Sequence, residues 1–99
     1  MALQISKTKN VFTLTGKFNA NEVFHVRNFF LHKLRFEDSF TISLAGLEDL
    51  DLSAVLMFKG LKDEANHINK SVKIVNSENQ KILGPFRKLE DQFVLSVAA

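Results

Sequence analysis

Three histidines carry the clearest metal-binding chemistry in this sequence. His25 and His32 are seven residues apart and can share one face of a helix. Two histidines without a third ligand make a poor metal site, and the His-Glu-x-x-His spacing of zinc enzymes is absent. His67 falls near the end of a predicted helix, where an interaction with the helix dipole is the simpler role. We therefore expect no metal site and no cofactor.

Serine and threonine hydroxyls are the other candidate reactive groups, but none of them stands in a catalytic context. A nucleophilic serine needs a neighbouring base, and the sequence has no Gly-x-Ser-x-Gly elbow. The four glycines, at positions 16, 46, 60 and 84, form no loop that would cradle a phosphate. The sequence therefore predicts a protein that is not an enzyme.

The segment from Leu47 to Val55 joins acidic, hydroxyl and apolar side chains at the start of a predicted helix. Asp51 or Ser53 can cap that helix, and acidic side chains are favourable beside the positive end of its dipole. Capping does not explain the apolar side chains that crowd the same turn, which are Leu52, Val55, Leu56 and Met57. Only some of these can point inward from one helix, so we expect one or two to face solvent as a docking patch.

The elements that must position this segment follow from the apolar periodicity. Strands are predicted at residues 3–5, 11–15, 40–44, 72–75 and 93–97, with the third reading as a buried central strand. Helices are predicted to begin near Asn21, Leu52 and Ser77, and the second to end near His67. The order ββαβαβαβ predicts a single α/β domain over residues 1–99, with a mixed sheet of four to five strands and about three helices.

Phenylalanine is the only aromatic residue type, and its ring has no polar group, so the ten rings are expected first in the core. In the first helix the apolar stripe is formed by Val23, Val26, Phe30 and Leu34, widened by Phe24 and Leu31. In the second helix one face carries Ala54, Phe58, Leu61, Ala65 and Ile68. The residues predicted to be largely buried are Phe12, Leu14, Phe30, Ile42, Leu44, Phe58, Leu61 and Ile74.

Composition excludes several classes of protein. The chain has 99 residues, 45% of them hydrophobic and 24% charged, which are the proportions of an ordinary folded domain. The 13 basic and 11 acidic residues are scattered without a basic stripe, so we expect no nucleic-acid partner. There is no cysteine, no signal-peptide pattern and no apolar run of the roughly 18 residues that a membrane span needs, so we expect a cytoplasmic protein.

Four short motifs, in order along nearly the whole chain, resemble those of the STAS domain, the module of anti-sigma factor antagonists and of sulfate transporter tails. Residues 16–20 (Gly-Lys-Phe-Asn-Ala) resemble the family's Gly-x-Leu-Asp-Ala signature, with Asn in place of Asp. Residues 40–44 resemble its central strand, and residues 72–77 the strand and helix cap that follow. Residues 51–55 (Asp-Leu-Ser-Ala-Val) stand where the family carries Asp-Ser-Ser/Thr-Gly-Leu. The family's usual final helix has no counterpart, because the predicted elements end with the strand at 93–97.

The resemblance implies a bacterial regulator of transcription that signals by binding a protein partner, an anti-sigma factor of the kinase type. In such antagonists the serine directly after the aspartate is phosphorylated, which releases the partner. Here that position is Leu52, which has no hydroxyl, and Ser53 matches the second hydroxyl position, while Ala54 replaces the glycine. We therefore expect the phospho-switch to be absent, with Ser53 as the alternative acceptor. The expected partner-binding residues are Asp49, Asp51, Leu52, Ser53, Val55, Leu56 and Met57.

Two other functions fit the same fold. One is a soluble accessory subunit of a membrane transporter of lipids or anions, which would use the same docking patch. The other is a small-ligand or nucleotide-binding domain, which requires a pocket with converging polar groups instead of a flat apolar surface.

Overall fold

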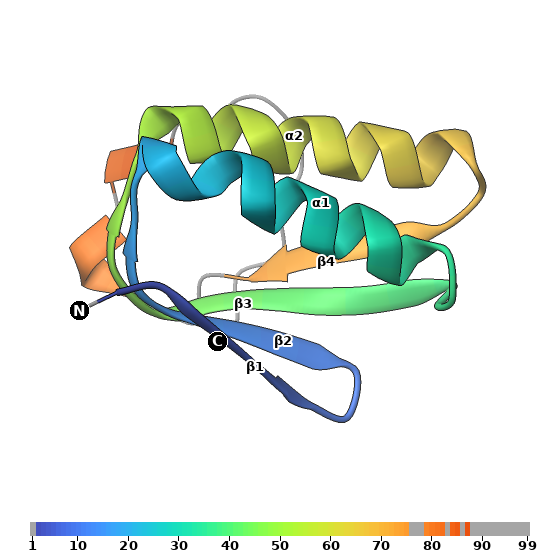
Figure 1. The fold of residues 1–99 in the computed structure, drawn as a ribbon, viewed down its shortest axis with the longest axis horizontal. Helices are drawn as coiled ribbons and strands as arrows, with labels where there is room; N and C mark the ends of the chain where they lie inside the picture. The colour runs from blue at the N-terminus through green and yellow to red at the C-terminus, as the bar shows by residue number, and fades with distance from the viewer. Residues whose placement is uncertain (1, 76–78, 83, 86, 88–99) are drawn as a thin grey trace.

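In the part of the chain that the structure describes, four strands form one mixed sheet, and their order in the sheet follows their order in the chain (Figure 1). The structure is a computed structural model that describes residues 2–75, 79–82, 84–85 and 87. Strands β1 (Gln4–Thr8) and β2 (Val11–Phe18) pair as an antiparallel hairpin. Strand β3 (Ser39–Leu50) is parallel to β2, and β4 (Ser71–Val75) is parallel to β3. The predicted mixed sheet is therefore confirmed, with β3 inside it, whereas the strand predicted at 93–97 lies outside the described residues.

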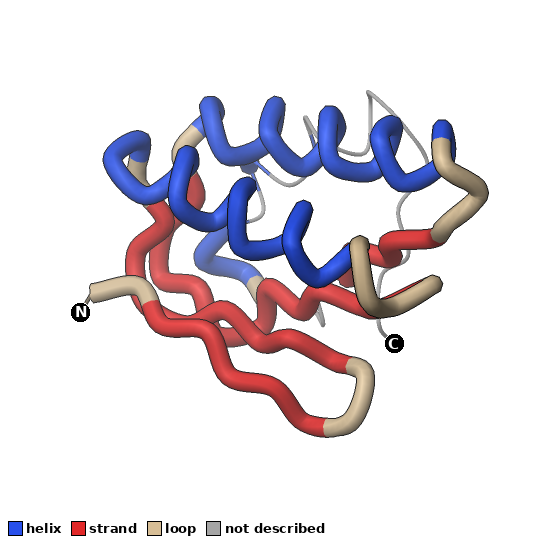
Figure 2. The backbone as a smooth tube through the Cα atoms, turned by 45° about the vertical axis from the view of Figure 1, so that its right-hand side comes forward, coloured by secondary structure: helices blue, strands red, loops and turns tan. Residues whose placement is uncertain are grey.

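Two long helices cover one face of this sheet (Figures 1 and 2). A 3₁₀ turn, η1 (Ala20–Glu22), leads into α1 (Val23–Leu34), and α2 (Leu52–His67) has the bounds that the periodicity predicts. Each helix returns the chain between two neighbouring parallel strands, so α1 and α2 run in the same direction. The described part of the chain holds these two long helices rather than about three. The expected start of the third, Ser77, lies outside the described residues, and a 3₁₀ turn, η2 (Gln80–Ile82), follows.

The core lies between the sheet and the two helices, and among the described residues five of its twenty buried apolar side chains are phenylalanines, whereas Phe24 and Phe36 are exposed. All eight residues predicted to be buried are buried. The Phe12 ring makes edge-on contacts with Phe30 and Phe40, with ring centroids 5.4 and 5.3 Å apart, and the Phe18 ring does so with Phe58 at 5.7 Å. Such contacts add to the stabilisation from area burial alone.

Two apolar residues assigned to the core stripes lie on the surface instead. Phe24 is 67% exposed, because it lies six residues before Phe30 and therefore about 120° around the helix from it. Ile68 is 47% exposed, because α2 ends at His67 and Ile68 is its C-cap, with backbone angles that leave the helix. Both predictions were wrong because each residue lies at the margin of its helix, Phe24 at the side of the apolar stripe and Ile68 beyond the last helical residue.

Strand β3 runs well beyond the predicted residues 40–44 and ends only at Leu50. Strand β2 extends beside it to Phe18, and the pairing absorbs two register shifts, between Thr13 and Thr15 and between Gly16 and Lys17. Gly16 has a φ of 96°, in the region that favours glycine. Gly46 packs directly against Thr15, leaving no room for a side chain. The longer strand carries the chain to the start of α2 without a loop.

Candidate functional site at the start of helix α2

The ends of β2 and β3 meet the start of α2 at one edge of the molecule. In the strand register Lys17 lies opposite Asp49, and Phe18 opposite Leu50. The backbone N–H of Asp51 then donates to the carbonyl oxygen of Phe18 at 2.8 Å. Asp51 is the only residue between the last residue of β3 and the first of α2. The start of α2 is therefore fixed directly to two neighbouring strands.

Asp51 is the N-cap of α2, as the sequence predicts. Its backbone is extended, and its Oδ2 accepts a hydrogen bond from the backbone N–H of Ser53 at 2.8 Å. The Ser53 hydroxyl donates a second, short hydrogen bond to the same oxygen. The bond from the hydroxyl makes the larger contribution and the bond from the backbone N–H the smaller one. Both stabilise the ionised carboxylate and so lower the pKa of Asp51 below its ordinary 3.8. The Ser53 hydroxyl is thus already engaged in the cap.

Two of the four apolar residues in the first turns of α2 face solvent. Leu52 is 53% exposed and Leu56 is 58% exposed, and the two are four residues apart, on one side of the helix. Val55 and Met57, which we had included among the partner-binding residues, are buried in the core. Neither can contact a partner in this conformation. We refer to the exposed pair as the Leu52/Leu56 patch.

Polar side chains border the Leu52/Leu56 patch. Asp49 and Asp51 are exposed, and Ser53 is half-buried. The Asp49 Oδ1 accepts a hydrogen bond from the backbone N–H of Leu50 at 2.9 Å, which holds this carboxylate close to the chain. Of the seven predicted partner-binding residues, the structure brings five together at or near the surface.

Lys17 and Asn19 are surface residues of this edge that the sequence analysis did not include. Lys17 is exposed and lies opposite Asp49 in the register, and the Asn19 side chain caps η1 by accepting a hydrogen bond from the N–H of Asn21 at 3.0 Å. Both belong to the motif at residues 16–20, which carried only the family resemblance. The parallel pairing of β2 with β3 was the signal that would have placed them at the site, because the carboxyl ends of parallel strands lie at one edge.

The chemistry of this edge is that of a cap and an apolar surface. Within the residues that the structure describes, no group of three or more potential ligands is arranged to hold a metal ion. His25, His32 and His67 are all exposed. In the same described part of the chain, no helix has the length and apolar character needed to cross a membrane. What the edge offers a ligand is two leucines flanked by carboxylates.

Comparison with known proteins identifies the fold. No family model matches the sequence, and no curated protein is significantly similar to it. Among solved structures, the chain is similar to the anti-sigma factor antagonist SpoIIAA in its unphosphorylated form, with a TM-score of 0.74 and 14% identity over 99% of this chain and 89% of that one. It is also similar to an anti-sigma factor antagonist from Mycobacterium paratuberculosis, with a TM-score of 0.70 and 11% identity over 95% and 83% of the two chains.

SiaC of Pseudomonas aeruginosa is a further similar structure, with a TM-score of 0.64 and 13% identity over 100% of this chain and 98% of that one. These identities are low, and what they establish is a shared architecture. The chain has the STAS-like fold of the anti-sigma factor antagonists, as its motifs indicated.

Proposed function

We propose that this chain is a cytoplasmic protein-binding module of the anti-sigma factor antagonist type, with no catalytic activity of its own. The observation that carries the proposal is the Leu52/Leu56 patch. Two leucines that are more than half exposed, one turn apart at a fixed helix start, are costly to leave in water and suited to burial against a partner. The similarity of the whole fold to proteins described as anti-sigma factor antagonists supports the same class.

The proposed partner is an anti-sigma factor of the kinase type, bound without a phosphorylation switch at Leu52. Leu52 offers no acceptor atom, and the neighbouring Ser53 hydroxyl donates to Asp51. A phosphate on Ser53 would break that bond and place nearly two negative charges beside the Asp51 carboxylate, and the repulsion between these like charges offsets the favourable field of the helix start. We therefore expect binding to be constitutive.

An accessory subunit of a membrane transporter remains the second reading, because it would use the same patch. Identification of the bound partner distinguishes the antagonist function from the transporter-subunit function. A small-ligand function would need polar groups that converge on a pocket, whereas the exposed side chains that carry the present proposal are two leucines.

The experiment compares what the purified protein retains from an extract of its native host. The wild type is expected to retain a kinase-type anti-sigma factor, and Leu52→Glu and Leu56→Glu are expected to lose it. Phe36→Glu is the matched control, because Phe36 is also an exposed apolar residue but lies after α1, away from the patch. Retention of the same partner by the double leucine variant would show that the patch is not the binding surface.

A further inference from the structure

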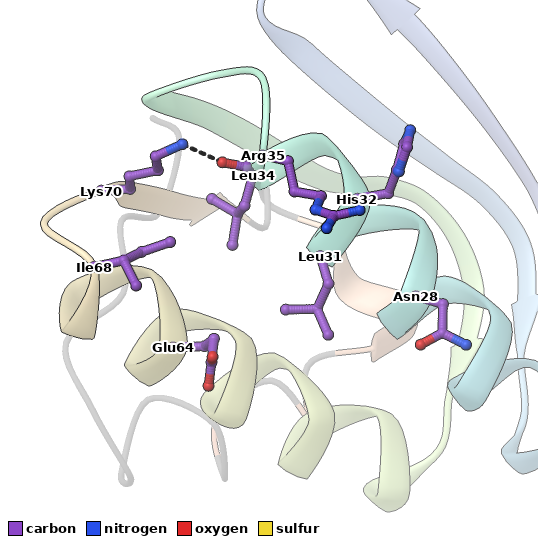
Figure 3. Close-up of a pocket in the computed structure, with 8 residues that line it drawn as sticks. All are labelled: Asn28, Leu31, His32, Leu34, Arg35, Glu64, Ile68 and Lys70. Carbon is purple, nitrogen blue, oxygen red and sulfur yellow. Dashed lines mark hydrogen bonds between the residues drawn. The ribbon is translucent and has the colours of Figure 1, made fainter.

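A groove of about 560 Å³ lies between the C-terminal halves of α1 and α2 (Figure 3). Leu31 and Ile68 point into the space between the two helices, and the buried Leu34 lies beneath them (Figure 3). The groove is more open than enclosed. A small molecule is held by a site that covers 70–90% of its surface, so an open groove suits a larger and more extended occupant.

Opposite charges stand on the two rims of this groove. Arg35 lies at the C-cap of α1, and Glu64 lies on α2. Both side chains are exposed, and neither makes a hydrogen bond or an ion pair with another residue that the structure describes. Lys70, also at the groove, differs because its ammonium donates to the Leu34 carbonyl oxygen and so caps α1. Arg35 and Glu64 are therefore the charges left for an occupant.

The same outer face continues toward the starts of both helices. Phe24 lies eleven residues before Arg35, which places it within about 20° of the same side of α1. Gly60 lies one turn before Glu64, and a Cβ placed on it would meet no heavy atom within 4 Å. The outer face of the helix pair thus has exposed apolar side chains at Phe24, Ile68 and Leu56, which lies one turn before Gly60, and open space at Gly60.

We propose that this face binds the same face of a second copy of the chain. A two-fold axis running along the groove, parallel to both helices, places α1 of one copy over α2 of the other. Because α1 and α2 run in the same direction, this operation sets Arg35 of each copy against Glu64 of its partner, twice in one interface. Apolar side chains around the groove meet between the two charge pairs. The face is thus complementary to itself, which is the requirement for a closed two-fold dimer.

The size of the face sets the strength of the association. The 16 residues of α2 span about 24 Å, and two helices side by side cover about 20 Å. The area of this face, which is the product of these two lengths, is smaller than the roughly 800 Å² per partner of a standard stable interface. The dimer is therefore weak and forms reversibly as the concentration rises.

The test is sedimentation equilibrium of the full chain from about 10 µM to about 1 mM, a range that brackets weak association. The mass is expected to rise from 11.2 kDa toward twice that value. Arg35→Glu and Glu64→Arg each put two like-charged pairs in the interface, so each is expected to raise the dissociation constant about tenfold or more. The double variant Arg35→Glu/Glu64→Arg restores both pairs, and its dissociation constant is expected within about threefold of the wild type.

Lys73→Glu is the control matched to Arg35→Glu, because it makes the same change in net charge at an exposed position of β4 and is expected to leave the dissociation constant unchanged. Gly60→Gln adds a side chain into open space above α2 and is expected to weaken the dimer while leaving the circular dichroism spectrum unchanged. A wild type that stays monomeric at about 1 mM, or a double variant no tighter than its single parents, would overturn the proposal. No partner protein enters these measurements, so failure of the dimer is distinguishable from failure of the function proposed for the Leu52/Leu56 patch. Because Leu56 lies one turn before Gly60 on α2, the dimer would also cover part of that patch.

Discussion

The carboxylate of Asp51 holds Ser53 by two hydrogen bonds, one from its backbone N–H and one from its hydroxyl. A capping aspartate ordinarily satisfies one of the free N–H groups at a helix start. Here the same oxygen also fixes the side chain of the only hydroxyl residue in the first turn of α2. The cap and the candidate phosphate acceptor therefore form a single unit.

The first prediction concerns the dependence of stability on pH. The pKa of Asp51 is lower in the folded chain than in the unfolded chain, so the ionised cap stabilises the fold above the ordinary value of 3.8. That contribution is lost as the pH falls through the lower, folded-state value. In urea unfolding, wild type is expected to be more stable than Asp51→Ala at pH 7, and the difference should shrink below pH 3.8. An equal difference at pH 7 and at pH 2 would show that the charge of the cap is unimportant.

The second prediction concerns Phe58 in the core. Its ring is fully buried and lies edge-on to Phe18, so truncation leaves a cavity that the sheet cannot close. Phe58→Ala is expected to lower the free energy of unfolding by about 3–5 kcal/mol. Phe36→Ala removes an exposed ring and is expected to change it by less than about 0.5 kcal/mol. Similar denaturation midpoints for the two variants would contradict the assignment of Phe58 to the core.

The third prediction compares two glycines whose surroundings differ. A Cβ on Gly46 would lie 2.9 Å from the Leu14 carbonyl oxygen and would also strike Thr15, so Gly46→Ala is expected to cost about 1–3 kcal/mol. Gly60 sits in α2 with open space around it, so Gly60→Ala is expected to add about 0.5–1 kcal/mol of stability. Thermal unfolding of the two variants beside the wild type measures both effects. The same sign of change in both would contradict the close approach of β2 and β3 at Gly46.

The fourth prediction concerns phosphorylation at the start of α2. Wild-type protein incubated with a kinase-type anti-sigma factor and ATP is expected to stay unmodified, whereas Leu52→Ser is expected to gain one phosphate and to release the partner. The side chains at positions 52 and 53 differ by about 100° around the helix, and in-line transfer tolerates such displacement poorly. Intact-mass measurement and peptide mapping decide the outcome. Stoichiometric phosphate on Ser53 of the wild type, with release of the partner, would refute the absence of the switch.

The sequence predicts best those elements whose signals are local. Helix α2 has the predicted bounds because Asp51 caps it and the apolar spacing from Ala54 to Ala65 has one period. Residues 46–50 lie beyond the strand predicted at residues 40–44, yet they extend β3 because β2 lies beside them. Pairing between distant segments decides such cases, and a local pattern does not contain it.

The candidate sites show the same division. The exposure of Leu52 and Leu56 follows from crowding of four apolar residues at one helix start, and the sequence predicts that one or two of those four face solvent without showing which. Lys17 reaches this edge only because β2 and β3 are parallel neighbours. The groove between α1 and α2 depends on which faces of two helices lie together, and Arg35 and Glu64 are 29 positions apart in the chain. The periodicity of each helix alone carries no information on its neighbour.

A single residue, Asp51, joins the central strand to α2, and its N–H is bonded to the neighbouring strand. The Leu52/Leu56 patch therefore has no flexible loop to order when a partner arrives, and little backbone entropy is lost on association. If the proposed function holds, a partner meets a template that is already ordered. Discrimination between related partners then rests on steric fit to this helix start rather than on a loop that folds around each of them.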